Sequence, residues 1–162
     1  MSDSSLRLVL DTNVLLAGLV SQSSASQKIV DALKARRAIP LISTPVMAEY
    51  RAVLLHPAII ARFPDLTPRR VGLALYRLRY VGDEFATTGV KFDFPRDSRD
   101  AMFVELAIAG FATHIITLDG DLLSLPTART DAGKRFRQRL PGTEILQPGT
   151  MIERHGVVLG ID

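Results

Sequence analysis

The chain has 162 residues, of which 47% are hydrophobic and 23% are charged, as is ordinary for a globular domain of this size. It has no cysteine, which excludes disulfide bonds and thiolate chemistry. Its 20 basic and 17 acidic residues give a formal net charge of +3, an excess too small to identify a polyanionic partner by itself.

No apolar run in the sequence is long enough to cross a bilayer, because the longest, from Ala101 to Ala109, contains Glu105. The first residues, MSDSSLRL, are polar and lack the basic region, apolar core and cleavage site of a secretory signal. We therefore expect a single domain over residues 1–162, with no membrane segment and a cytoplasmic location.

Along the chain, apolar β-branched runs predict strands and amphipathic segments predict helices. In order, these are a strand at 6–10, a helix at 25–37, a strand at 39–42, helices at 45–55, 67–80 and 98–109, and strands at 114–118 and 144–146. Residues 81–87 are compatible with a short edge strand. The alternation predicts an α/β fold in which helices cover both faces of a central, mainly parallel sheet.

Helix ends and one biased segment add detail to this outline. Thr44 is expected to cap the helix that follows it, with Pro45 in the first turn. Gly110 is expected to form the C-cap of the fourth helix. The basic segment 127–140 is expected to be a surface excursion before the last strand.

Carboxylates follow the predicted strands. Asp11 comes directly after the first strand, and Asp119 closes the run HIITLD in the same way. Glu49 shares a helix face with apolar residues, where a lone carboxylate is costly unless something pairs with it. Asp100 lies near the start of the fourth predicted helix. Because ligands bind beyond the carboxyl ends of parallel strands, we expect these four acids to converge there.

Four converging acids predict a bound cation. Two carboxylates ~4 Å apart repel each other by about 4 kcal/mol at an effective dielectric constant near 20, so four of them cannot all stay ionised alone. Oxygen ligands without a Cys or His cluster favour Mg²⁺ or Mn²⁺ over Zn²⁺. Such a site commonly activates water against a phosphodiester.

Simpler roles exist for several of these acids. Asp97 and Asp100 are placed where they could cap a helix and offset its dipole. Asp121, in the sequence LDGD, is more typical of a turn than of a metal ligand, and Asp119 could share that turn role.

Four motifs, in order along the chain, resemble those of PIN-domain nucleases, in particular the subgroup of toxin components of toxin-antitoxin systems. They are VLDTNVLLAGL, STPVMAEYRAVLLHP, RDSRDAMFVELAIAG and HIITLDGDLLSL, and the similarity extends over nearly the whole chain. The resemblance implies a three-layer α/β/α sandwich and Mg²⁺- or Mn²⁺-dependent endonucleolytic cleavage of RNA. It also implies a cognate antitoxin protein as a partner and self-association into a homodimer.

The resemblance also implies roles for individual residues. The family's catalytic and metal-binding acids fall on Asp11, Glu49, Asp100 and Asp119, with Glu49 either ligating the metal or orienting the attacking water. Asn13 matches an asparagine that supports the first acid, Thr117 matches the hydroxyl residue before the last, and Asp121 is a candidate auxiliary ligand.

The third motif departs from the subgroup in one respect. Arg99 and Ala101 flank Asp100, whereas the subgroup usually carries further acids beside the catalytic one. This departure removes negative charge near the expected metal, and it puts both the metal affinity and a second metal in question.

Two basic clusters are candidates for binding RNA. The first comprises Arg69, Arg70, Arg77 and Arg79 with Tyr76 and Tyr80, and the second comprises Lys134, Arg135, Arg137 and Arg139 with Phe136. Such runs also arise as ordinary solvated helix faces.

Other functions fit parts of the sequence. A haloacid-dehalogenase-like phosphatase would use Asp11 as a nucleophile, but such enzymes require an acid two residues later, where Asn13 stands. A non-cleaving module that binds RNA or protein is a second alternative. His56, His114 and His155 are scattered and are expected to be structural, which gives little support to a Ser-His-Asp triad.

Overall fold

The computed structural model describes residues 5–161 and contains a five-stranded sheet in the order β3-β2-β1-β4-β5. The strands are β1 (Arg7–Leu10), β2 (Ile39–Ile42), β3 (Asp83–Glu84), β4 (His114–Ile116) and β5 (Glu144–Leu146). All four strand pairings are parallel. The predicted parallel sheet is therefore confirmed, and the segment 81–87 does contribute a short edge strand.

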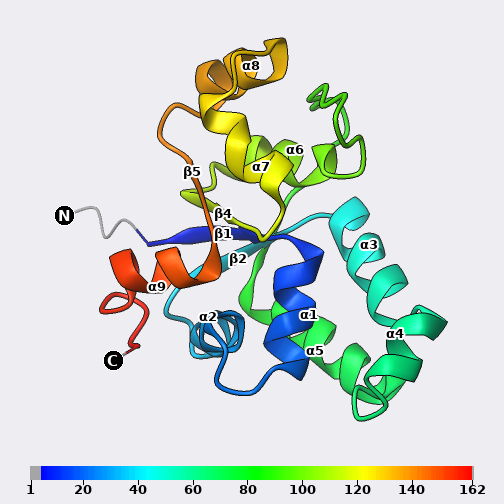
Figure 1. Ribbon diagram of the computed structural model, residues 1–162. Coiled ribbons are helices and arrows are strands. Elements are labelled where there is room, and N and C mark those ends of the chain that lie inside the picture. Colours follow the sequence, from blue (N-terminus) through cyan, green and yellow to red (C-terminus); the bar gives the residue numbers. More distant parts are fainter. Residues whose placement is uncertain (1–4, 162) are drawn as a thin grey trace.

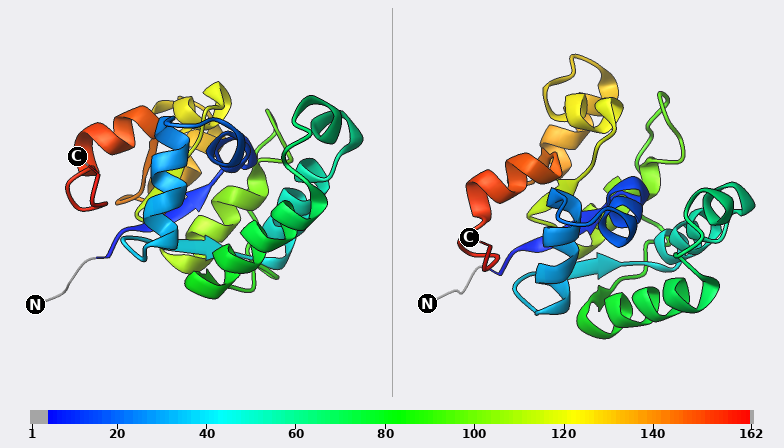
Figure 2. Two further views of the ribbon diagram at one scale, coloured as in Figure 1. Left: turned by 90° about the horizontal axis from the view of Figure 1, so that it is seen from below. Right: turned by 60° about the horizontal axis from the view of Figure 1, so that its bottom comes forward.

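Helices cover both faces of the sheet, which confirms the three-layer α/β/α arrangement. The helices are α1 (Thr12–Val20), α2 (Ala25–Lys34), α3 (Thr44–Leu54), α4 (Pro57–Arg62), α5 (Pro68–Val81), α6 (Ala101–Gly110), α7 (Gly120–Ser124), α8 (Asp131–Arg139) and α9 (Pro148–His155), with a 3₁₀ turn η1 at Leu125–Thr127. Helices α1, α2, α5 and α9 lie on one side of the sheet, and α6 and α7 lie on the other, with α8 farther from the sheet (Figures 1 and 2).

The two central strands form the middle of the hydrophobic core. Leu8 and Val9 of β1 and Ile115 and Ile116 of β4 are completely buried. Both faces of these strands are covered, so apolar residues occupy successive positions instead of alternating with polar ones. Within residues 5–161, no helix is long and apolar enough to span a membrane.

Two local expectations about helix ends are wrong. The N-cap of α3 is Ser43, whose side chain accepts a hydrogen bond from Val46 N–H at 3.3 Å, and Thr44 is already helical. Gly110 is the last residue of α6, and the C-cap is Phe111 in the left-handed conformation at φ 54°. A Cβ at Gly110 would lie 2.7 Å from Leu41 Cδ1, so a larger residue there would force the Leu41 side chain to shift.

The segment 127–140 is more ordered than a surface excursion. Thr130 caps α8 by accepting a hydrogen bond from Gly133 N–H at 3.1 Å. Ala132 and Phe136 are buried, whereas the basic residues between them face solvent. The segment is therefore an amphipathic helix that contributes to the core.

Candidate metal centre

Three acidic side chains meet at the carboxyl edge of the sheet. Asp11 directly follows β1, Asp100 directly precedes α6, and Asp119 lies between β4 and α7. One carboxylate oxygen from each lies within 4.8 Å of the other two. Asp11 and Asp100 are buried, whereas Asp119 is half-buried and exposes the cluster to solvent. These three residues, called the acid cluster below, form a compact group of oxygen ligands.

Each acid of the cluster occupies the N-cap position of a helix, but only Asp119 caps with its side chain. Asp119 Oδ1 accepts a hydrogen bond from the backbone N–H of Asp121 at 2.8 Å. The side chains of Asp11 and Asp100 make no capping hydrogen bond. Asp100 therefore occupies the N-cap position that the sequence suggested, but its carboxylate does not bind the free N–H groups of the first turn, as a capping carboxylate would.

Hydrogen bonds from neighbouring elements fix the position of Asp11. Thr117, which is completely buried, donates its hydroxyl to Asp11 Oδ2 at 2.7 Å and accepts from Asp119 N–H at 2.9 Å. Tyr50 of α3 donates its hydroxyl to the carbonyl of Leu10 at 2.5 Å. Thr117 directly after β4 and Tyr50 of α3 thus hold the end of β1, and with it the first acid, in one place.

The charges in the cluster are strongly coupled. Burial, the hydrogen bond with Asp119 and the charges of Asp11, Asp119 and Asp97 raise the pKa of Asp100 to about 8. Burial also raises the pKa of Asp11, against the opposing effect of the Thr117 hydrogen bond. The hydrogen bond with Asp100 lowers the pKa of Asp119. Without a cation, the cluster therefore retains a proton on Asp100 near neutral pH.

The arrangement fits a hard divalent cation. Asp100 Oδ2 is buried and has no hydrogen-bond partner, so one carboxylate oxygen is left without a protein donor. Buried polar atoms normally have a partner, and an unmatched one calls for a water or an ion. The three ligands are all carboxylates, which suits Mg²⁺ or Mn²⁺.

A protein-family model described as a PIN domain matches residues 7–121. The chain belongs to the PIN domain family. PIN domains are generally nucleases that use divalent metals, and the acid cluster lies within the matched region. The match ends at Asp121, whereas the motifs led us to expect similarity over nearly the whole chain. No curated protein and no solved structure matches the chain.

Other sequence-predicted residues of this PIN domain lie outside the acid cluster. Glu49 is half-buried on α3 and is not among the three acids that the described residues bring together. Asn13 is exposed on α1 and makes no side-chain hydrogen bond within residues 5–161. Asp121 is half-buried and forms an ion pair with Arg96 at 3.6 Å.

Asp97 contributes to the site of this PIN domain in a way that the sequence did not indicate. Its charge raises the pKa of both Asp11 and Asp100. Its Oδ1 accepts a hydrogen bond from Arg99 N–H at 3.0 Å, inside the turn that leads to α6. Asp97 therefore supplies part of the negative charge that Arg99 and Ala101 remove from the third motif.

The predicted basic cluster on α5 is divided between the two ends of the helix. Arg69 and Arg70 lie in its first turn, whereas Arg77 and Arg79 lie near its end, which leads into the amino end of β3. Arg79 pairs with Glu84 at 3.2 Å. Arg77 and Arg79 thus lie toward the sheet edge opposite the acid cluster.

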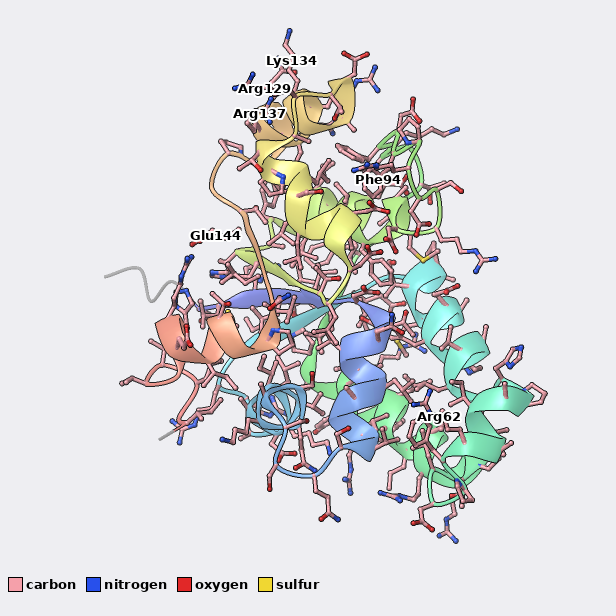
Figure 3. The ribbon with its side chains drawn as sticks, in the orientation of Figure 1. Arg62, Phe94, Arg129, Lys134, Arg137 and Glu144 are labelled. Carbon is pink, nitrogen blue, oxygen red and sulfur yellow. The ribbon has the colours of Figure 1, made fainter. Side chains whose placement is uncertain are left out.

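The predicted basic cluster on α8 lies far from the middle of the sheet, as Lys134 and Arg137 show in Figure 3. Arg137 Nη1 donates to the carbonyls of Pro126 and Ala128 at 3.0 and 2.8 Å. Phe136 is buried in the core. Phe136 is therefore not accessible to RNA, although the sequence had grouped it with this basic cluster.

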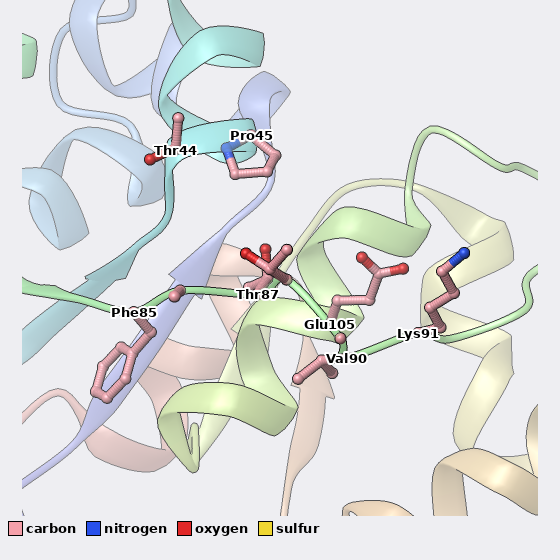
Figure 4. Close-up of a pocket in the computed structure, with 10 residues that line it drawn as sticks. Thr44, Pro45, Phe85, Thr87, Val90, Lys91 and Glu105 are labelled. Carbon is pink, nitrogen blue, oxygen red and sulfur yellow. The ribbon is translucent and has the colours of Figure 1, made fainter.

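A pocket of about 730 Å³ opens between the start of α3, residues 85–91 and α6. Figure 4 shows Glu105 on its wall, facing the segment that carries Thr87 and Lys91. Glu105 Oε1 accepts a hydrogen bond from Phe92 N–H at 3.3 Å. None of the three clustered acids lines this pocket, and Glu105 holds the loop that leads to Asp100.

Proposed function

We propose that this PIN domain is a metal-dependent endoribonuclease that hydrolyses RNA phosphodiester bonds and acts as the toxin of a toxin-antitoxin pair. The observation that supports this most is the acid cluster, in which Asp11 and Asp100 occupy N-cap positions without capping a helix. The helix N–H groups therefore do not engage their oxygens, and Asp100 Oδ2 has no hydrogen-bond partner at all. A binding module that does not cleave has no need for this arrangement.

Asp11, Asp100 and Asp119 would hold the Mg²⁺ or Mn²⁺ ion. When bound, this ion supplies a Lewis acid that offsets the negative charge developing on the phosphate. Thr117 orients Asp11, and the backbone of α7 orients Asp119, so two of the three ligands are fixed before an ion arrives. Such support from neighbouring groups typically raises metal affinity by ~10–100-fold.

Glu49 would act on the attacking water and not as a principal ligand. It precedes Tyr50, whose hydroxyl bonds the carbonyl of Leu10 and so ties α3 to the end of β1. A carboxylate outside the cluster can accept a proton from water without sharing the repulsion among the three ligands. Glu49→Gln should therefore slow cleavage while leaving Mn²⁺ affinity within about twofold.

The RNA would approach over the loop that carries Arg96 and Arg99. Arg96 is exposed and pairs with Asp121, and Arg99 is exposed beside Asp100. Positive charge next to a negative cluster favours a polyanionic substrate. Replacing both arginines by alanine should weaken RNA binding, and it should reduce the slope of log affinity against log salt by about 0.7 for each arginine that binds a phosphate.

Cleavage of purified, structureless RNA tests the activity directly. The wild type should cut in Mg²⁺ or Mn²⁺ and not in EDTA, and Asp11→Asn should be inactive while unfolding cooperatively. An Asp11→Asn variant that cuts as well as the wild type would contradict the proposal. Metal binding without cleavage of any RNA would favour the non-cleaving module, and a covalent phosphoaspartate at Asp11 would favour the phosphatase.

We also propose that the chain binds a cognate antitoxin protein and that it forms a homodimer. Leu118, 49% exposed, lies next to Asp119, so a protein that covers it would also obstruct the acid cluster. Co-expression with the product of an adjacent small gene should yield a complex in which cleavage is lost. Light scattering of the purified chain measures its molar mass and should give that of a dimer. The mass of a monomer at all concentrations would contradict the proposed homodimer.

A further inference from the structure

Two histidines and a glutamate meet at the amino edge of the sheet, opposite the acid cluster. His114 is the first residue of β4, Glu144 is the first of β5, and His155 is the last of α9. The parallel register pairs His114 with Glu144, and α9 runs back from β5 to bring His155 to the same edge (Figure 1). Figure 3 labels Glu144 at this edge. One potential ligand atom from each residue lies within 4.8 Å of the other two.

The hydrogen bonds of His114 leave one ring nitrogen free. Its Nδ1 lies 2.9 Å from the hydroxyl of Thr113. That hydroxyl donates to the Arg7 carbonyl at 3.0 Å and accepts from the Arg7 N–H at 2.9 Å. When the single hydroxyl proton is directed to the Arg7 carbonyl, Nδ1 of the neutral ring is the donor to Thr113, and Nε2 carries a lone pair. This bond to a fixed acceptor is the one that orients metal-binding histidines in proteins.

Both imidazoles have a buried nitrogen that no protein group satisfies. His114 Nε2 and His155 Nε2 lack a hydrogen-bond partner within residues 5–161, and His114 is only 5% exposed. The two rings contact each other edge to face, with centroids 4.7 Å apart. Two unmatched buried nitrogens this close together are unfavourable unless something binds them.

Glu144 divides its two oxygens between different neighbours. Its Oε2 accepts a hydrogen bond from Arg154 Nη1 at 2.7 Å. Its Oε1 lies 3.8 Å from His114 Nε2, which is too long for a hydrogen bond. Arg154 thus orients the carboxylate, and its positive charge also limits how tightly a cation can bind.

We propose that His114, His155 and Glu144 form a second metal site, which binds a divalent transition-metal ion of the Zn²⁺ class. Two imidazoles and one carboxylate are a ligand set that Zn²⁺ accepts and that Mg²⁺ does not favour. Bonds of about 2.0–2.2 Å place tetrahedral ligands roughly 3.4 Å apart. The ligand atoms now lie within 4.8 Å of one another, so no pair has to close by more than about 1.4 Å. His155 is half-buried and is the last residue of α9, so its side chain is the one that we expect to make this adjustment.

The site would have a structural role. His114 lies within the region that matches the PIN family, whereas Glu144 and His155 lie in residues 122–161, beyond the match. An ion bound by all three would tie β5 and α9 to the central strand β4. The proposal is independent of nuclease activity, because it involves none of the clustered acids.

Zn²⁺ binding should be measured in a background that removes the acid cluster, since carboxylates also bind Zn²⁺. The background is the full chain carrying Asp11→Asn and Asp100→Asn. Metal is first removed from this protein with EDTA, and the EDTA is then removed by dialysis. Calorimetric titration should give one Zn²⁺ per chain. Adding His155→Gln should weaken binding by at least ~10-fold, whereas adding His56→Gln, which changes the histidine before α4, should leave it unchanged.

A spectroscopic measurement identifies the ligands. Zn²⁺ should shift the imidazole ¹⁵N resonances of His114 and His155 and leave those of His56 unchanged, and Mg²⁺ should shift none of them. Zn²⁺ should also raise the Tm of the background protein, and Glu144→Gln should reduce this rise. The proposal is overturned if the background protein binds no Zn²⁺, or if His155→Gln binds it as tightly as the background does.

Discussion

Replacing Asp100 by asparagine should stabilise the metal-free protein while it abolishes metal binding. In the folded chain, burial, the hydrogen bond with Asp119 and the nearby negative charges raise the pKa of Asp100 to about 8 from 3.8. Between these two pH values, the folded chain keeps a proton that the unfolded chain has released, so the stability of the wild type falls as pH rises. Asparagine at position 100 cannot ionise and avoids this loss.

The size of the effect follows from the shift in pKa. A rise from 3.8 to about 8 corresponds to an upper limit of roughly 6 kcal/mol, at about 1.36 kcal/mol per pKa unit. The same hydrogen bond lowers the pKa of Asp119, which offsets part of this cost, and solvent that reaches Asp119 screens the charges. We therefore expect Asp100→Asn to raise the free energy of unfolding by about 2–3 kcal/mol at pH 8, or Tm by roughly 5–10 °C.

Thermal unfolding followed by circular dichroism measures both parts of this prediction. In EDTA, the Tm of Asp100→Asn should exceed that of the wild type by more at pH 8 than at pH 5. Mn²⁺ should raise the Tm of the wild type and not that of the variant. Asp31→Asn, which neutralises an exposed acid on α2, is the control and should behave like the wild type. A variant that is less stable than the wild type in EDTA, or that keeps the full Mn²⁺ response, would refute the reasoning.

Three further predictions concern other parts of the fold. Thr117→Val removes the hydroxyl that donates to Asp11 at 2.7 Å, and it should weaken Mn²⁺ binding by about 10-fold in calorimetry; unchanged affinity would count against the role of this hydroxyl. Gly110→Ala would place a Cβ 2.7 Å from Leu41 Cδ1, and it should lower the free energy of unfolding in urea by about 1–3 kcal/mol; an unchanged value would mean that this packing relaxes freely. Burial and the neighbouring imidazole lower the pKa of His114 from 6.5 to about 4. Between these two pH values, in EDTA, the unfolded chain therefore binds more protons than the folded chain does. The stability should therefore fall by up to about 3 kcal/mol as pH drops from 6.5 to 4, and His114→Gln should lose this slope in denaturant titrations at several pH values.

The strands and the first and last acids of the site were predictable because they depend on local sequence. A short run such as residues 8–10 is apolar at successive positions, since a central parallel strand is covered on both faces. The chain leaves the sheet at the end of such a strand, so Asp11 had to lie at its carboxyl edge. Parallel pairing then brought Asp119 to the same edge.

The separation of Glu49 from the acid cluster was not predictable from spacing. Its place on an apolar helix face indicated a ligand, but the direction of its side chain depends on how α3 packs against its neighbours. Asp97 was considered only as a helix cap, since its effect on the pKa of Asp11 and Asp100 acts through space across a turn. The sequence also could not predict which of the clustered acids caps a helix with its side chain, because a carboxylate at an N-cap position can turn either toward the helix or away from it.

The sequence by itself determined the α/β class, the parallel sheet and the placement of the acids at strand ends, because each depends on a repeating local pattern. Only the tertiary structure decided which side chains share a site. His114, Glu144 and His155 come from three separate elements and meet solely through the register of β4 with β5 and the return of α9. Contacts between residues so distant in sequence follow from packing, which no local spacing records.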